Sequence, residues 1–309
     1  MSVVQGTSAP GTPAPVTNPV YRTTVADLIA LGKPRVTFLV IVTAFGGMWL
    51  SPMPLHLGYT LLALFAINLV VYGASALNMY LEVDTDALMV RTRNRPLPSG
   101  RMNPELALWI GLAASVVSVA LCTLCLNPLT GLLAALSLII YVLAYTPWKR
   151  RSTLALIIGA IPGAAPPLMG WTAATGRIDP GGLTLFFILF VWQIPHFLAI
   201  SIFRKDDYVA AGLKVVPGVL GVAATKVRIA LYAALLGVTT LPAYATGISS
   251  RAYLWVAVPL SLGFLVLAVS GLRVDSTPES DNVWARRVFV ATLFHLPIVI
   301  LALAIFRRV

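Results

Sequence analysis

The stretch that decides the fold is residues 57–81, LGYTLLALFAINLVVYGASALNMYL, which has 25 residues and no charged side chain. A helix needs about 20 predominantly apolar residues to cross the hydrocarbon core of a bilayer. A helix is also the expected conformation, because each backbone amide finds its partner inside the segment where water is absent. We therefore predict that residues 57–81 form a membrane-spanning helix.

Similar apolar runs continue on both sides of this segment. The whole chain is 58% hydrophobic and 11% charged, with a mean hydropathy of +0.87, whereas soluble domains carry about 25% charged residues. This composition excludes a soluble globular protein and predicts an all-α, polytopic membrane bundle of about nine transmembrane helices. We place them at residues 36–51, 57–81, 105–126, 129–146, 153–174, 182–203, 226–247, 253–272 and 288–306.

The segment ahead of the first span differs in composition. Residues 1–24 are rich in Pro and Thr and lack the apolar stretch of a signal peptide. We predict a disordered cytoplasmic tail over 1–24 and one transmembrane domain over 25–309. Residues 25–35 are short, mildly amphipathic and end in a basic Lys-Pro-Arg sequence, which is typical of a segment lying at the membrane surface.

Basic residues lie mainly on one side of the predicted bundle. Eighteen of the 22 fall in the N-terminal segment and in alternate loops, around residues 82–104, 147–152, 204–228 and 273–287. Because positive loops stay in the cytoplasm, we predict a cytoplasmic N-terminus and an outside C-terminus in a bacterial cytoplasmic (inner) membrane. The net charge of +11 follows from this orientation, so no nucleic-acid partner is predicted. Ten of the 11 acidic residues share that side, although acidic residues do not set topology.

Three oxygen-bearing side chains follow the second span at helical spacing. If the helix continues past the membrane edge, Asn78, Glu82 and Asp86 lie at i, i+4 and i+8 and share one face, whereas Asp84 points roughly 120° away. Such a column suits Mg²⁺, which typically takes one or two carboxylates and completes its shell with water and phosphate oxygens. We predict Asn78, Glu82 and Asp86 as metal ligands, with Asp84 as a less favourable fourth.

Arginines follow this column directly. The guanidinium groups of Arg91, Arg93 and Arg95 offer planar donors for phosphate oxygens. Acidic residues followed by basic ones would bind a magnesium–diphosphate complex. The alternative is a charged loop that only fixes orientation, but that role does not require ionisable groups at the membrane edge, where they are costly.

These residues resemble the first motif of the UbiA-type intramembrane prenyltransferases. Asn78, Glu82, Asp86 and the pair Arg91-Thr92 match its register, while Met79 replaces a common acidic residue and Glu82 stands where Asp is usual. The resemblance implies an enzyme that binds Mg²⁺ and a prenyl diphosphate at the cytoplasmic rim and holds the prenyl chain among the helices.

Further segments resemble the haem O synthase branch of this family. They are residues 89–95, residues 145–153 (YTPWKRRST) and the Gly/Pro-rich residues 159–171. The resemblance implies that farnesyl diphosphate and haem B are the substrates and that water adds to give haem O. It also implies possible contact with haem A synthase or an oxidase assembly factor. We expect the diphosphate to meet Arg91, Arg95, Lys149 and Arg150.

The second signature of that branch is similar to residues 192–197 and 203–212. Only the adjacent pair Asp206-Asp207 occurs where most of the family has two spaced aspartates, and we favour Asp207. His196 is either a buried structural histidine, a ligand of haem iron or a proton acceptor. Together with Asn78, Glu82 and Asp86, we predict Asp207 and His196 as the catalytic residues.

Other features have simpler interpretations, and rival functions remain open. The Cys122-x-x-Cys125 pair lies inside a predicted span and is interpreted as packing. The Gly and Pro residues of 159–171 would break backbone hydrogen bonds and allow close helix approach, or form a packing kink. Rival functions are prenylation of an aromatic ring in a quinone or chlorophyll pathway, transport across the membrane, and a structural or assembly role.

Overall fold

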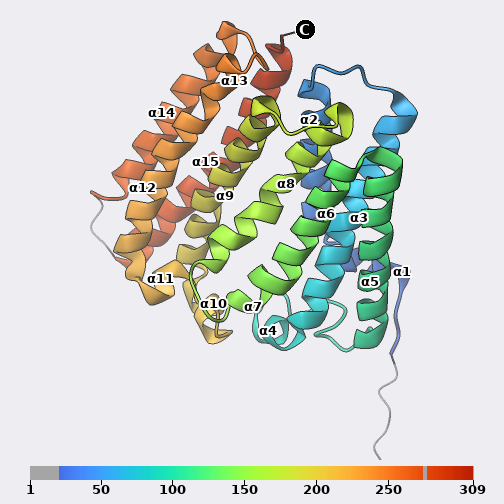
Figure 1. Cartoon of the computed structure of the whole chain (residues 1–309). Helices are drawn as coiled ribbons and strands as arrows, with labels where there is room; N and C mark the ends of the chain where they lie inside the picture. Colours follow the sequence, from blue (N-terminus) through green and yellow to red (C-terminus); the bar gives the residue numbers. More distant parts are fainter. Residues whose placement is uncertain (1–20, 274–276, 309) are drawn as a thin grey trace, which may run out of the picture.

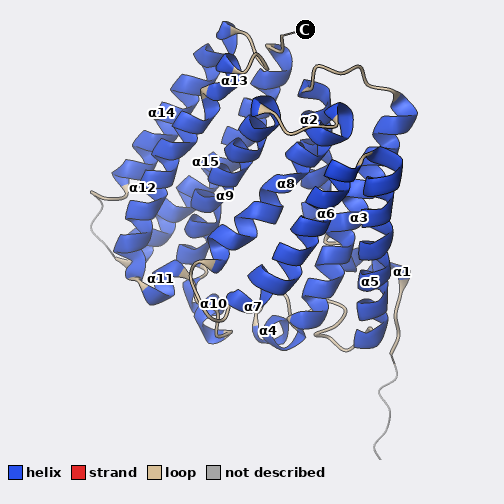
Figure 2. Cartoon of the chain, viewed as in Figure 1, coloured by secondary structure: helices blue, strands red, loops and turns tan. Residues whose placement is uncertain are grey.

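The computed structural model describes residues 21–273 and 277–308, and this part consists of helices joined by loops (Figures 1 and 2). The α-helices are α1 (Val25–Leu31), α2 (Pro34–Leu50), α3 (Leu57–Leu81), α4 (Val83–Leu88), α5 (Pro104–Leu121), α6 (Pro128–Ile139), α7 (Thr146–Trp148), α8 (Ala155–Thr175), α9 (Pro180–Phe203), α10 (Lys205–Ala210), α11 (Val216–Val219), α12 (Gly221–Thr240), α13 (Pro242–Ala245), α14 (Leu254–Ser270) and α15 (Pro278–Ile305). Two π-helical segments, Cys122–Leu126 and Ile140–Tyr145, extend α5 and α6, and a short 3-10 turn, Arg251–Tyr253, precedes α14.

The predicted bundle of about nine spans is confirmed. Within the described residues, eight helical segments are long and apolar enough to cross a membrane, and the pair α1 and α2, bent by 52°, gives a ninth if it counts as one span. The chain is therefore an integral membrane protein. Most of the predicted 1–24 tail lies outside the described residues; residues 21–24 lead into α1, whose first turn is capped by Thr24.

Two helices, α8 and α9, lie in the middle of the bundle (Figure 1). Helix α8 packs against α2 and α6, and α9 packs against α12 and α15, while α8 and α9 also contact each other. The largest apolar cluster is centred on α9 and includes residues of α8, α12, α14 and α15. A second cluster joins α2, α3 and α6 with α8. The two middle helices thus hold the two sides of the bundle together.

Glycines bring the backbones of α2 and α8 into direct contact. A Cβ on Gly47 would overlap the carbonyl oxygen of Pro167, and a Cβ on Gly170 would overlap that of Ala44. The predicted close approach is confirmed. Helix α8 is assigned as one helix from Ala155 to Thr175, with three prolines inside it that each lack a backbone N–H donor.

Two predicted boundaries also differ. The last helix begins at Pro278 rather than at residue 288, because Thr277 caps it and Pro278 occupies its first turn. Its first turns are held by Asp281, whose carboxylate lies 2.5 Å from the ammonium of Lys226 on α12. Helix α12 begins at Gly221, five residues earlier than predicted. The Cys122-x-x-Cys125 pair falls in the first π-helical segment, with Cys122 buried and Cys125 exposed.

Candidate active site

The three predicted metal ligands keep their column although the helix that carries them is interrupted. Helix α3 ends at Leu81, Glu82 adopts φ −108° and ψ 12°, and α4 follows at once. The amide of Glu82 nevertheless donates to the carbonyl of Asn78 (3.0 Å), and the amide of Asp86 donates to that of Glu82 (2.7 Å). These i to i+4 bonds preserve the helical stacking across the break. The uninterrupted helix assumed from the sequence is thus wrong, while the spacing argument holds.

Glu82 is the centre of the site. Its side chain is buried, and its two carboxylate oxygens lie 2.8 and 2.9 Å from the ammonium of Lys149. The amide of Asn78 donates to the same carboxylate at 2.9 Å. Burial opposes the charge on Lys149, but Tyr145 and the Glu82 carboxylate outweigh it and raise the Lys149 pKa. Lys149, which follows α7, is therefore held as a cation against the acidic column.

The side-chain amide of Asn78 has a defined orientation. Its nitrogen donates both to Glu82 and to the hydroxyl of Thr146 (3.0 Å), and that hydroxyl donates its own proton to the carbonyl of Tyr141 (2.8 Å). The Asn78 oxygen is consequently directed the other way, where the ammonium of Lys33 lies 2.8 Å from it. The oxygen that a metal would use thus already faces a positive charge.

Lys33 was not among the residues predicted from the sequence. It precedes α2 in a left-handed backbone conformation, φ 51°. Burial and the nearby charges of Arg95 and Lys149 lower the pKa of its ammonium to about 7, although Glu82 and Asp86 favour the charged form. The signal that could have identified it is the basic Lys-Pro pair at the start of the first span. A half-buried residue 45 positions away in the sequence therefore contacts Asn78.

Asp86 forms the lower end of the column and is almost fully buried. One carboxylate oxygen lies 2.6 Å from the guanidinium of Arg95. Its neighbour Thr85 contacts the guanidinium of Arg150. Asp84 is exposed, whereas Glu82 and Asp86 are buried. Three of the four predicted diphosphate residues, Arg95, Lys149 and Arg150, thus contact the 82–86 segment.

Asp207 on α10 contacts the loop that follows α4. Its carboxylate accepts a hydrogen bond from the backbone amide of Val90 (3.3 Å). Beside it, the guanidinium of Arg91 lies 4.9 Å from the ring centre of Tyr208, whose pKa is raised by burial. The acidic segment after α9 and the arginine-rich loop after α4 therefore meet, although 117 residues separate Val90 and Asp207.

The donor set fits a hard divalent cation. It consists of two carboxylates and an amide oxygen, the ligand types that Mg²⁺ prefers. Each of the three already faces a cationic side chain, from Lys149, Arg95 and Lys33 respectively. Among the described residues no group of three His, Cys, Asp or Glu side chains gathers at one point.

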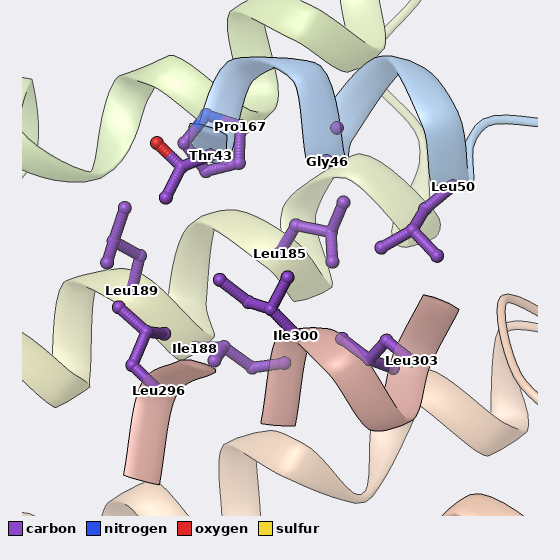
Figure 3. A pocket seen from close by; sticks show the side chains of 11 residues that line it. Thr43, Gly46, Leu50, Pro167, Leu185, Ile188, Leu189, Leu296, Ile300 and Leu303 are labelled. Carbon is purple, nitrogen blue, oxygen red and sulfur yellow. The ribbon is translucent and has the colours of Figure 1, made fainter. Parts of the chain in front are cut away.

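His196 lies apart from this cluster, between α9 and α15. Its Nδ1 is 2.8 Å from the hydroxyl of Thr292, and its ring stacks on that of Trp192 at 4.9 Å. The same two helices also line a small apolar pocket of about 30 Å³ between α2, α8, α9 and α15. Figure 3 shows side chains of Leu189, Ile188, Leu296 and Ile300 lining that space.

The comparisons with known proteins agree with this geometry. The UbiA prenyltransferase family matches residues 39–305. A protoheme IX farnesyltransferase of Sorangium cellulosum is 47% identical over 282 residues, covering 86% of this chain and 99% of the relative. One of Anaeromyxobacter dehalogenans is 45% identical over 281 residues, covering 91% and 94%.

A solved structure of similar fold is the UbiA homolog from Archaeoglobus fulgidus bound to DMAPP and Mg²⁺. It superposes with a TM-score of 0.66 at 15% sequence identity, covering 88% of this chain and 99% of the other. At that identity the likeness concerns the arrangement of the helices.

Proposed function

The chain belongs to the UbiA prenyltransferase family, and we propose that it transfers a farnesyl group from farnesyl diphosphate to a vinyl group of haem B, giving haem O and diphosphate. The relatives that match nearly the whole chain are protoheme IX farnesyltransferases. The single structural observation that carries the proposal is the convergence of Asn78, Glu82 and Asp86 with Lys33, Lys149 and Arg95 at one end of the bundle.

The basic residues bind and stabilise the diphosphate. As the bond between the allylic carbon and oxygen breaks, the electron pair leaves with the diphosphate, so negative charge grows at the end of the bundle where Lys33, Lys149 and Arg95 lie. Positive charges placed where negative charge develops lower the barrier. Arg91 and Arg150, both exposed at the rim, would capture the diphosphate from the water side.

The acidic column has a different part in the same step. Asn78, Glu82 and Asp86 would hold Mg²⁺, which supplies positive charge to the diphosphate oxygens when bound. In the structure the side-chain oxygens of Asn78, Glu82 and Asp86 face the cationic groups of Lys33, Lys149 and Arg95. Binding of the metal and diphosphate would therefore move the three cationic side chains from the ligands to the diphosphate, which keeps charge balanced in the buried site.

The remaining steps take place among apolar side chains. The vinyl group of haem B donates its π electrons to the allylic carbon, forming the new carbon–carbon bond and leaving a cation beside the porphyrin ring. Water adds to that cation and releases a proton, which completes the hydroxyethylfarnesyl side chain. The prenyl chain would lie among the apolar side chains between α2, α8, α9 and α15, where the pocket of about 30 Å³ would have to widen to admit it. These side chains would keep water from the first cation.

We also propose the orientation of the protein in the membrane. Asn78, Lys149 and Asp207 lie in or beside the segments that hold eighteen of the 22 basic residues. Because basic loops stay in the cytoplasm, this supports a cytoplasmic site and N-terminus, with the C-terminus outside, in a bacterial inner membrane. Contact with haem A synthase or an oxidase assembly factor stays a prediction.

The test is an assay of the purified chain in lipid nanodiscs with farnesyl diphosphate and Mg²⁺. Haem B and 4-hydroxybenzoate would be offered in parallel as acceptors, with product detection by mass spectrometry. We expect a haem product carrying the farnesyl group and one added water. Prenylated 4-hydroxybenzoate with unchanged haem would instead support the aromatic alternative, and absence of both products would overturn the enzyme assignment.

A further inference from the structure

We infer that His196 binds the iron of the haem substrate through its Nε2 atom, in a site between α9 and α15 that lies apart from the diphosphate cluster. This inference rests on the proposed function, because it presupposes haem as the acceptor. It concerns the binding of haem iron, whereas the acidic column and its cations bind the magnesium–diphosphate group.

The protonation of the His196 ring follows from its neighbour Thr292. The Thr292 hydroxyl donates its only proton to the backbone carbonyl of Phe289, 2.5 Å away. The same oxygen lies 2.8 Å from Nδ1 of His196, so it must accept there and Nδ1 must carry the proton. The Nε2 atom of His196 is then the unprotonated nitrogen, with a lone pair available for a metal.

That lone pair has no competing partner among the described residues. The hydrogen bond between His196 and Thr292 uses only Nδ1. Among the described residues Nε2 has no hydrogen-bond partner, and it is not one of the fully buried atoms that lack one, so it is accessible. A metal-binding histidine usually donates its other nitrogen to a fixed acceptor, which orients the ring and sets its tautomer. His196 and Thr292 have this arrangement before any iron is bound.

His295 on α15 is enclosed by the helices, and its Nδ1 is buried without a hydrogen-bond partner. It is 1% exposed, and its Nε2 lies 3.3 Å from the Ser261 hydroxyl inside the α14–α15 contact. No macrocycle could reach it without separating the helices. His196 is only partly buried, so the difference between the two residues is one of access.

Aromatic rings surround His196 and suit a flat macrocycle. Trp192 stacks on its ring at 4.9 Å and 22°, and Phe289 lies at 4.9 Å. Phe197 meets the ring edge-on at 5.3 Å and is itself 45% exposed. These contacts hold the imidazole in one orientation, and the exposed face of Phe197 offers a surface for stacking with a porphyrin.

A cationic group lies at the water side of the same cluster. The Phe203 ring packs against Phe289 at 5.8 Å, and the guanidinium of Arg286 lies 4.9 Å from the centre of the Phe203 ring. Arg286 is exposed and belongs to the first turns of α15 (Pro278–Ile305). A haem bound through His196 could thus keep its two propionates at the rim beside Arg286, where Arg forms bidentate contacts with carboxylates.

The apolar pocket lies next to this position. His196 follows Leu189 by about two helical turns on α9, and Thr292 precedes Leu296 by about one turn on α15. Both leucines line the pocket in Figure 3. Ligation at His196 would therefore fix the macrocycle at the inner end of the space proposed for the prenyl chain, while its vinyl groups remain free to react.

The test is haem binding without farnesyl diphosphate, using the full chain in nanodiscs and a purification tag without histidine. The chain has three histidines, so each can be replaced by Ala in turn. We expect the resonance Raman signature of an iron–imidazole bond in the wild type and in His56→Ala. His196→Ala should lose it and bind haem at least about tenfold more weakly, yet bind metal-free protoporphyrin IX as the wild type does.

Two further variants keep the test independent of folding. Added imidazole should restore the signature in His196→Gly, and Thr292→Val should shift the iron–imidazole frequency while retaining haem. An unchanged signature in His196→Ala, in a wild type that farnesylates haem, would overturn this inference and leave the proposed function intact. A wild type that neither binds nor farnesylates haem would overturn both.

Discussion

The ammonium of Lys149 lies within 2.9 Å of both carboxylate oxygens of Glu82. This contact joins the end of α3 to the segment between α7 and α8, across 67 residues of sequence. It places the acidic column and the basic Lys-Arg-Arg sequence on the same side of the bundle. A charge pair of this kind, buried and surrounded by further cations, is expensive for a membrane protein unless it is used.

Replacement of Glu82 by Gln should reduce farnesyl transfer by about a hundredfold. The substitution removes the negative charge of one proposed Mg²⁺ ligand, and so weakens the metal binding that stabilises the departing diphosphate. Gln retains the size of the side chain and its hydrogen bond with Asn78. The measurement is turnover with haem at saturating farnesyl diphosphate. Asp84→Asn is the matched control, since Asp84 is exposed two residues away; equal losses in the two variants would refute the assigned role of Glu82.

Replacement of Lys33 by Met should lower kcat/KM for farnesyl diphosphate by about tenfold to a hundredfold. The reason is the loss of the ammonium that lies 2.8 Å from the Asn78 oxygen and would move to the departing diphosphate. Arg35→Met, an exposed neighbour on the same helix turn, should behave as the wild type. The idea fails if both substitutions leave kcat/KM unchanged.

The two adjacent aspartates on α10 should differ in effect. Asp207 accepts the Val90 amide and ties α10 to the loop after α4, whereas Asp206 is exposed. We expect Asp207→Asn to lower turnover at least about tenfold, since the loop that carries Arg91 and Arg95 would lose its anchor, and Asp206→Asn to have little effect. Initial rates with haem would show the difference, and the reverse order of the two variants would contradict it.

The contact of α2 with α8 can be tested with neighbouring glycines. A methyl group on Gly47 would overlap the Pro167 carbonyl, whereas one on Gly46 would meet nothing within 4 Å. Gly47→Ala should therefore lower the free energy of unfolding by about 1–3 kcal/mol, and Gly46→Ala should leave it unchanged or raise it slightly. Thermal unfolding in detergent, followed by tryptophan fluorescence, is the measurement. Equal unfolding temperatures would show that the two helices can separate at little cost.

Much of this architecture could be predicted from the sequence. A span leaves an uncharged run of about 20 residues, so the nine segments can be recognised from the pattern of apolar residues alone. The stacking of Asn78, Glu82 and Asp86 was also predictable, because backbone bonds at four-residue spacing survive the break at Glu82. The convergence with Lys149 followed from the topology, since successive inner loops lie on one side of a membrane.

Other features depend on contacts that no local pattern reveals. The position of Lys33 beside Asn78 requires the left-handed turn between α1 and α2 and the packing of α2 onto α8. The first turns of α15 are polar, so hydropathy hid them, and only the Thr277 cap and the pairing of Asp281 with Lys226 reveal the helix. The tautomer of His196 depends on Thr292, 96 residues later.

The central claim is that the oxygen ligands at the end of α3 bind a magnesium–diphosphate complex together with the surrounding cations. Its most direct test is the affinity for a non-hydrolysable farnesyl diphosphate analogue, measured with and without Mg²⁺ in the wild type and in a Glu82→Gln/Asp86→Asn double variant. We predict that Mg²⁺ strengthens binding in the wild type and has no effect in the double variant. The same dependence on Mg²⁺ in both proteins would contradict the account.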